Sequence, residues 1–161
     1  MIRQLHSKRD GFTLIEILMV CVISVMFLGV GFAGFRDFSR RQEVLVARRT
    51  VLSDLNLAQK NAQTGTKPDS CNGSLEGYSF EITSTNPARY EVSAVCTNNE
   101  VLQLTKSLST GVTINTPATN PIIFGPLNRG TNLPRNTPVS LVLTSEGHTQ
   151  TISITWAGEI N

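Results

Sequence analysis

The sequence has little charge, few cysteines and only two histidines. Charged residues make up 16% of the 161 positions, and the formal net charge is +2. An ordinary soluble domain carries roughly 25% charged residues, and so small a net charge does not indicate a nucleic-acid-binding protein. Three cysteines exclude a disulfide-dense miniprotein. His6 and His148 supply too few ligands for a zinc centre.

Proline is absent before Pro68, and charge is nearly absent from residues 12–35, where Glu16 is the only charged residue. This apolar run is incompatible with a fully disordered chain or a fully soluble one. As a helix it would extend about 36 Å. We therefore expect residues 12–35 to form a helix that crosses a lipid bilayer with some tilt.

The apolar run follows a short basic leader, residues 1–11. A basic leader, an apolar core and a small-x-small cleavage site at residues 31–33 also fit a secretory signal peptide. However, the run is longer than the roughly 7–15 apolar residues of such a peptide. It also begins with the carboxylate of Glu16, for which a signal peptide has no use. A simple single-span anchor is the third interpretation, and it gives Glu16 no task either.

The letters GFTLIE at positions 11–16, placed between a basic leader and an apolar run, resemble the processing site of type IV pilins and pseudopilins. The resemblance implies that a prepilin peptidase cuts between Gly11 and Phe12 and methylates the new amine of Phe12. It also implies that Glu16 neutralises a Phe12 ammonium, commonly that of a neighbouring subunit, during assembly. Opposite charges in a low dielectric stabilise each other, whereas either charge alone is costly.

This resemblance implies a structural subunit, not an enzyme, with no cofactor: a minor pilin or pseudopilin of a type IV pilus or type II secretion pseudopilus. The implied partners are other pilin subunits, a prepilin peptidase and an inner-membrane assembly platform. The chain would first cross the inner membrane once, with its globular domain outside the cytoplasm, and later join the filament. Many major pilins have a proline in the apolar helix, where this chain has glycines that either loosen the helix or allow close helix approach. These are Gly29, Gly31 and Gly34.

Residues 36–65 predict an amphipathic continuation of the helix, because apolar residues recur there at spacings of three, four and seven. Gly65 and Pro68 supply the stop signal. We place Asp54, Lys60 and the arginines on the other faces of the helix and interpret the arginines as a solvated surface. The apolar positions are Phe38, Leu45, Leu52, Leu55, Ala58 and Ala62.

Residues 66–161 predict a β-rich globular domain, because apolar and polar residues alternate in short segments. The clearest pair is 139–144 and 151–156, on either side of a turn at Glu146-Gly147. Further segments are 78–82, 90–95, 101–108, 111–115 and 122–124. The predicted fold class is α+β, a long N-terminal helix with a membrane half and an amphipathic half packed on an antiparallel sheet or sandwich. The order of elements also loosely resembles the GspH/FimT group of minor pilins.

Cys71 and Cys96 lie in the domain expected outside the cytoplasm, where cysteines oxidise. We predict a disulfide between them, which would close a loop of about 26 residues and contribute about 3.5 kcal/mol in the chain-entropy model. Cys21 lies in the apolar run and is interpreted as a small packing residue.

Two further functions stay open at this point: a pilus-tip module that captures DNA or a surface, and a β-domain released by signal peptidase. Residues 70–161 carry more acidic than basic side chains, which disfavours binding to nucleic-acid phosphates. Glu146 and His148 flank a turn and are interpreted as solvated groups, because a Ser/His/Asp site needs an oriented histidine. Residues 128–132 are interpreted as a polar surface turn.

Overall fold

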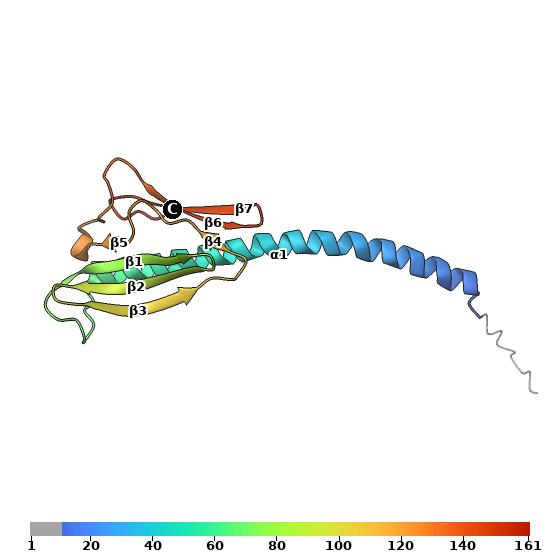
Figure 1. Ribbon diagram of the computed structural model, residues 1–161, viewed down its shortest axis with the longest axis horizontal. Helices are drawn as coiled ribbons and strands as arrows, with labels where there is room; N and C mark the ends of the chain where they lie inside the picture. Colours follow the sequence, from blue (N-terminus) through green and yellow to red (C-terminus); the bar gives the residue numbers. More distant parts are fainter. Residues whose placement is uncertain (1–10) are drawn as a thin grey trace, which may run out of the picture. The chain divides into compact units, whose positions relative to one another are not determined.

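The computed structural model describes residues 11–161, except for the side chains of residues 28–34. The chain forms two compact units, one ending at Phe38 and the other comprising Ser39–Asn161. Figure 1 shows the elements in chain order. They are α1 (Leu14–Thr64), β1 (Leu75–Thr85), β2 (Ala88–Cys96), β3 (Glu100–Ser107), β4 (Thr113–Ile114), β5 (Ile122–Phe124), the 3₁₀ turn η1 (Pro126–Asn128), β6 (Val139–Ser145) and β7 (His148–Ile154).

Both ends of the 51-residue helix α1 have defined capping groups. At the start, the Thr13 hydroxyl accepts a hydrogen bond from the Glu16 backbone N–H at 3.3 Å, which satisfies a donor that the first turn leaves unpaired. At the end, the N–H of Gly65 binds the Ala62 carbonyl and the N–H of Thr66 binds the Asn61 carbonyl. This pair of bonds, with Gly65 at φ +65°, is a Schellman motif. The predicted stop at Gly65 is confirmed.

The expected membrane-spanning half of the helix is a wrong prediction. Among the residues whose side chains the structure describes, no helix is long and apolar enough to cross a membrane. A span needs about 20 consecutive apolar residues. The carboxylate of Glu16 lies among the apolar side chains near the start of α1. The broader α+β class holds, because one long helix precedes antiparallel strands.

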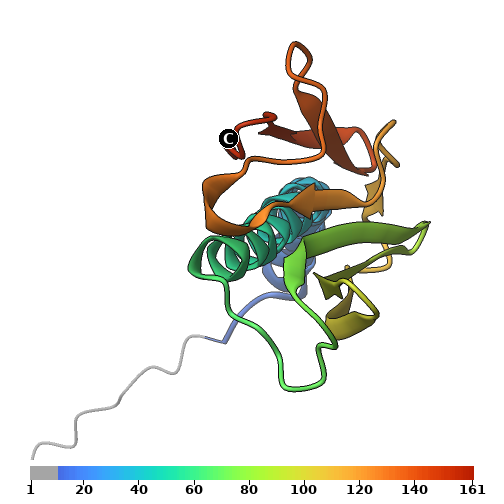
Figure 2. The ribbon, with the colours of Figure 1, turned by 90° about the vertical axis from the view of Figure 1, so that its left-hand side faces the viewer.

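The strands of the second unit form two antiparallel sheets. One has the order β3-β2-β1-β5 and the other the order β4-β6-β7. Figure 2 looks toward the end of α1 and shows β1–β3 on one side of the helix and β6–β7 on another. Residues 39–64 of α1 therefore bury one stripe of side chains against both sheets. The buried side chains of the helix and of the two sheets form a single core, which includes Tyr78, Phe80 and Leu141.

The core-facing stripe of the helix differs from the predicted one in its first half. Leu55, Ala58 and Ala62 are buried as predicted, but Leu45 is only partly buried and Phe38 is 58% exposed. The core instead receives Val44, Ala47 and Val51. Two apolar series run side by side along this helix, one residue and therefore about 100° apart. The positions of the sheets decide which series is buried.

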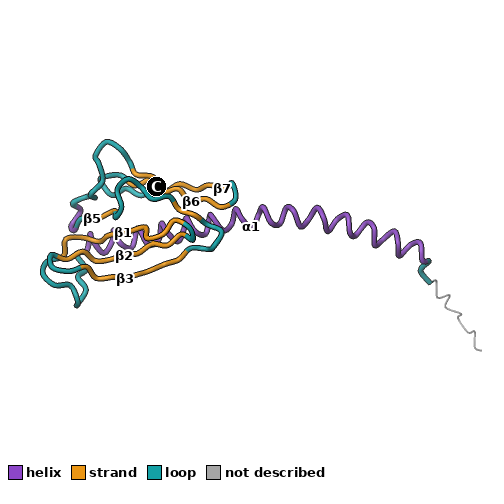
Figure 3. The backbone as a smooth tube through the Cα atoms, in the orientation of Figure 1, coloured by secondary structure: helices purple, strands orange, loops and turns teal. Residues whose placement is uncertain are grey.

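The strands lie largely in the predicted segments (Figure 3). The turn at Glu146-Gly147 joins β6 to β7, and the strand expected at 111–115 is reduced to the two residues of β4. The last strand begins earlier than predicted, at His148, and ends two residues earlier, at Ile154. The C-terminal residue then pairs with it, because Asn161 and Ser153 exchange two backbone hydrogen bonds of 2.9 and 3.0 Å.

A disulfide joins Cys71 and Cys96, the pairing expected from the sequence, with 5.8 Å between the Cα atoms. It connects the loop after α1 to the end of β2. The side chain of Asn99 holds the same loop, because it accepts a hydrogen bond from the Asn72 N–H at 2.7 Å and donates one to the Ser70 carbonyl at 2.8 Å.

Candidate functional site

The predicted cleavage site lies just ahead of the first helical turn. Gly11 and Phe12 precede α1, which begins at Leu14. Phe12 is 79% exposed, and the space around the Gly11 Cα is open. The Gly11–Phe12 peptide bond therefore lies outside regular secondary structure and is accessible to a peptidase. Residues 1–10 of the predicted leader lie outside the described residues.

The first turns of α1, which follow the predicted cleavage site, expose apolar side chains on every face. The large apolar residues between Phe12 and Phe27 range from 48% exposed at Val22 to 83% at Leu14. A helix that is apolar all round is stable in water only when something else covers it. The exposed side chains are Phe12, Leu14, Ile15, Ile17, Leu18, Met19, Val20, Val22, Ile23, Val25, Met26 and Phe27.

Thr13 caps the start of α1, a local contact that the sequence analysis missed. Thr13 and Glu16 stand in the spacing of a capping box, in which the first residue accepts a bond from the backbone of the fourth. The structure contains that bond. Glu16 also lines a shallow hollow on the helix surface together with Phe12, Ile17 and Cys21. The T-x-x-E pattern was the signal. The bond uses the backbone N–H of Glu16 and not its carboxylate, so a test of the Glu16 charge needs Thr13 as a separate control.

A second polar cluster lies inside the Ser39–Asn161 unit, where three elements bring together Asp54, Tyr90 and Lys106. The Tyr90 hydroxyl donates a hydrogen bond of 2.6 Å to Asp54 Oδ2. The Lys106 ammonium donates to both carboxylate oxygens, at 3.2 and 2.9 Å. Asp54 is 5% exposed and Tyr90 is fully buried. The carboxylate of α1 is thus bound by one group from β2 and one from β3.

This buried cluster corrects the prediction that Asp54 lies on an outer face of the helix. The signal for it was the alternation along β3, in which Lys106 stands between Leu104 and Leu108 on the side of the sheet that faces the core. An inward-pointing lysine needs a counter-charge. The side chain of Lys106 is 40% exposed, against 7% for Asp54, so its stem crosses the edge of the core and its ammonium stays near solvent.

Burial raises the pKa of the Tyr90 hydroxyl, and its hydrogen bond to the Asp54 carboxylate and the charge of that carboxylate raise it further. Above about pH 10 the unfolded chain loses this proton while the folded protein keeps it. The unfolding free energy is therefore expected to fall with rising pH there, by up to about 1.4 kcal/mol per pH unit. Denaturant titrations at pH 9 and pH 11 should show that the unfolding free energy falls less between these pH values in Tyr90→Phe than in the unchanged protein.

Tyr78 provides the control for this pH dependence, because burial raises the pKa of its hydroxyl as well. Its hydroxyl donates to the Thr66 carbonyl at 2.8 Å, without a carboxylate partner. Both substitutions should make the fall of the unfolding free energy between pH 9 and pH 11 smaller, and the effect of Tyr78→Phe should be weaker than that of Tyr90→Phe. Equal pH dependence in the unchanged protein and the Tyr90→Phe variant would contradict the assigned cause.

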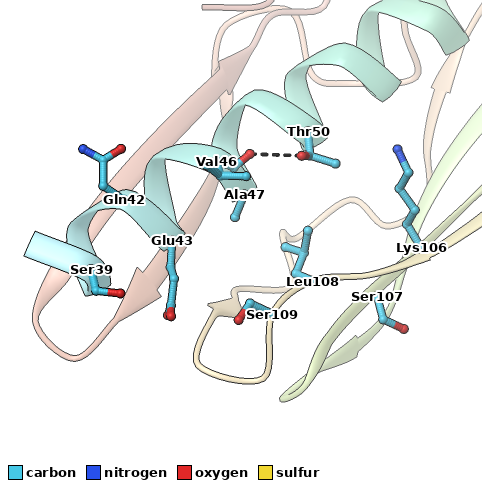
Figure 4. A pocket seen from close by; sticks show the side chains of 10 residues that line it. All are labelled: Ser39, Gln42, Glu43, Val46, Ala47, Thr50, Lys106, Ser107, Leu108 and Ser109. Atoms are coloured by element: carbon cyan, nitrogen blue, oxygen red, sulfur yellow. Dashed lines mark hydrogen bonds between the residues drawn. The ribbon is translucent and has the colours of Figure 1, made fainter. Parts of the chain in front are cut away.

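A groove of about 510 Å³ lies between α1 and the C-terminal end of β3. Figure 4 shows Val46 and Thr50 on the helix side and Leu108 and Lys106 on the other. The Glu43 side chain points toward the loop that carries Ser109. Among the described residues, Glu43 Oε2 and Ser145 Oγ are buried atoms without a hydrogen-bond partner. The groove is thus mostly apolar, with one buried acidic oxygen near its end.

Two of the arginines after the apolar run bind the β-domain, and they are not simply solvated. Arg40 forms an ion pair with Glu146 at 2.8 Å, and the Nε–H of Arg48 donates to the Thr151 carbonyl at 3.2 Å. Glu146, interpreted as a solvated turn residue, is 60% exposed in this pair. Both contacts tie α1 to the β6–β7 hairpin. An exposed pair of this kind contributes at most about 1 kcal/mol.

In the described part of the chain, no group of three or more His, Cys, Asp and Glu side chains is arranged to hold a metal ion. Comparison with known proteins adds no relative: no protein-family model, curated protein or solved structure matches this chain. The functional assignment therefore depends on the residues and geometry of the chain itself.

Proposed function

We propose that this protein is a structural subunit that assembles through its N-terminal helix into a filament of the type IV pilus or secretion pseudopilus kind. The observation that carries the proposal is the exposed apolar surface of α1 between Phe12 and Phe27, in which Glu16 is the only charged residue. A surface of this size on every face of a helix needs a partner. Helices of neighbouring subunits would supply it.

Packing of these helices supplies the association energy. Burying one large aliphatic or aromatic side chain is worth about 1.5–3 kcal/mol, so a few of the exposed residues on each face are sufficient to offset the cost of association. Large exposed apolar residues lie on all sides of this helix, and Phe12, Ile17 and Val25 are examples. One subunit can therefore contact several neighbours at once, which a filament core requires.

The two charges at the start of the helix give the filament its register. Cleavage after Gly11 would give Phe12 a free ammonium at the positive end of the helix macrodipole, where a cation is unfavourable. A carboxylate from the neighbouring subunit offsets this cost. In a dry interface either charge alone costs several kcal/mol, so Glu16 favours the one stagger of two helices that brings it to a Phe12 ammonium.

The β-domain fits a position outside the cytoplasm. Its disulfide between Cys71 and Cys96 is of the kind that persists in oxidising compartments. The domain is joined to the helix by a shared core, so it would be displayed on the surface of the filament that the helices form. Other pilin subunits and a prepilin peptidase are the partners that this function requires.

N-terminal processing tests the proposal directly. Mass spectrometry of the protein from its native host should find a mature chain that begins with N-methylated Phe12. Gly11→Leu should leave the precursor uncut, because a peptidase that fits the backbone at Gly11 has no room for a large side chain. The matched control is Ala118→Leu, which also puts leucine in place of a small exposed loop residue and should leave processing intact. A mature chain that begins at Gly34 would instead establish a signal peptide.

A further inference from the structure

The loop between β5 and β6 and the segment after β7 form a basic and aromatic patch, defined here by Leu127, Arg129, Arg135 and Trp156. The Arg135 guanidinium lies 5.2 Å from the Trp156 ring centroid, a cation–π contact. Trp156 is 41% exposed and Leu127 is 71% exposed. In the described chain neither arginine has an ion-pair partner. Tryptophan and arginine are the residues most enriched at the centres of protein interfaces.

The patch is held in a strained conformation. Leu127 has φ +52° and Asn128 has φ +61°, a region that costs a residue such as leucine roughly 1–2 kcal/mol. Gly130 brings the loop so close to Trp156 that a Cβ there would lie 2.7 Å from the Trp156 carbonyl oxygen. The Thr131 N–H donates to that same oxygen at 2.8 Å. Backbone hydrogen bonds from Gly125 to Gly130 at 2.7 Å and from Arg129 to Pro126 at 3.2 Å close the loop. They keep Leu127 in a strained and exposed position.

A complementary surface lies on the β1–β2–β3 sheet, on the face away from α1. Glu81 of β1 stands directly opposite Glu91 of β2 in the strand register, and like charges in this position destabilise a sheet. Glu100 of β3 lies on the same face, where its carboxylate accepts a hydrogen bond from the Ser79 hydroxyl at 2.8 Å. Arg89 of β2 lies on this face too, and its Nε–H donates a hydrogen bond to the Ser107 hydroxyl at 3.1 Å. Among the described residues, none of the three carboxylates has an ion-pair partner.

We infer that the basic and aromatic patch of one subunit docks onto the acidic face of the β1–β2–β3 sheet of a second copy of this chain. Arg129 and Arg135 would then meet Glu81 and Glu91, which relieves the repulsion between the two carboxylates. The two surfaces are different, and Figure 2 shows the β5–β6 loop and the β2–β3 edge on different sides of α1. Such a contact is heterologous and continues from subunit to subunit. It deepens the proposed function and rests on it, because it adds a contact between neighbouring β-domains.

Disulfide trapping in the full-length chain tests the contact independently of the helix. In a Cys21→Ser background, one preparation carries Arg129→Cys and the other Glu81→Cys. When the two preparations are mixed under mild oxidation, a cross-linked heterodimer should form. In the control pair, Ser140→Cys on the exposed face of β6 replaces Glu81→Cys. The yield of heterodimer should exceed that of the control pair at least tenfold. Adding Arg135→Glu to the first chain should reduce the cross-link, and adding Glu91→Lys to the second should restore it.

Each outcome of this experiment is decisive. A cross-link no stronger than the control overturns the docking contact, whether or not filaments form, so failure here is separate from failure of helix-mediated assembly. If Arg135→Glu reduces the cross-link and Glu91→Lys does not restore it, the assigned pairing is overturned. Leu127→Gly relieves the strain, so it should raise the thermal midpoint of the chain while it weakens the cross-link. Salt-sensitive binding of a DNA oligonucleotide that Arg129→Glu and Arg135→Glu abolish, with no cross-link, would assign the patch to nucleic acid instead.

Discussion

Glu16→Ala is expected to reduce incorporation into filaments more than a hundredfold while the Ser39–Asn161 unit stays folded. A Phe12 ammonium buried in a helix interface without its counter-charge costs about 3–5 kcal/mol, and each 1.4 kcal/mol is about a factor of ten in association. The buried core of the second unit contains no residue before Val44, so this substitution leaves it intact. Sedimentation of assembled filaments from cells, with immunodetection of the subunit, measures the effect.

Two further variants separate the charge of Glu16 from its place in the capping box. Glu16→Gln keeps the capping pattern and removes the charge, so its incorporation should be as poor as that of Glu16→Ala. Thr13→Ala removes the hydroxyl that accepts the Glu16 N–H and keeps the charge, at a cost of about 1 kcal/mol of helix stability. Normal incorporation of Glu16→Gln together with a defect in Thr13→Ala would show that assembly needs the cap from Thr13 and not the charge of Glu16.

Lys106→Met is expected to lower the unfolding free energy by about 3–5 kcal/mol, because it leaves the buried Asp54 carboxylate with a single hydrogen bond from Tyr90. The reverse change, Asp54→Asn, should cost less. The Lys106 ammonium is partly exposed and can turn to water, and the asparagine oxygen still accepts from Tyr90. Urea titration monitored by circular dichroism gives both values.

The double variant Asp54→Asn/Lys106→Met provides the decisive comparison. It removes both charges, so it should recover most of the stability that Lys106→Met loses, which is the signature of a coupled pair. Lys60→Met, at an exposed position of the same helix, is the matched control and should change stability by less than about 0.5 kcal/mol. If the two single effects simply add in the double variant, the buried pair is energetically uncoupled.

Several features of this protein are readable from the sequence because they depend on neighbours in the chain. The helix stop at Gly65 follows from glycine's tolerance of positive φ. The hairpin turn at Glu146-Gly147 follows from the change between apolar alternation and turn residues. The processing motif at Gly11, Phe12 and Glu16 is likewise a local pattern, and its function stays a prediction. Cys71 and Cys96 were the only cysteines available to pair within the β-domain.

The tertiary structure alone decided which groups meet. Two apolar series on residues 39–64 have nearly the same pattern, and the two sheets select the series of Val44 and Val51. The helix face that carries Val44 and Val51 also carries Asp54 into the core. There its carboxylate binds Tyr90 and Lys106, which come from two strands. Charge patterning along one helix assigns a carboxylate to solvent by default. It becomes buried only when groups distant in sequence satisfy it. The alternation along β3 indicates that Lys106 faces the core, but it does not identify Asp54 as the partner.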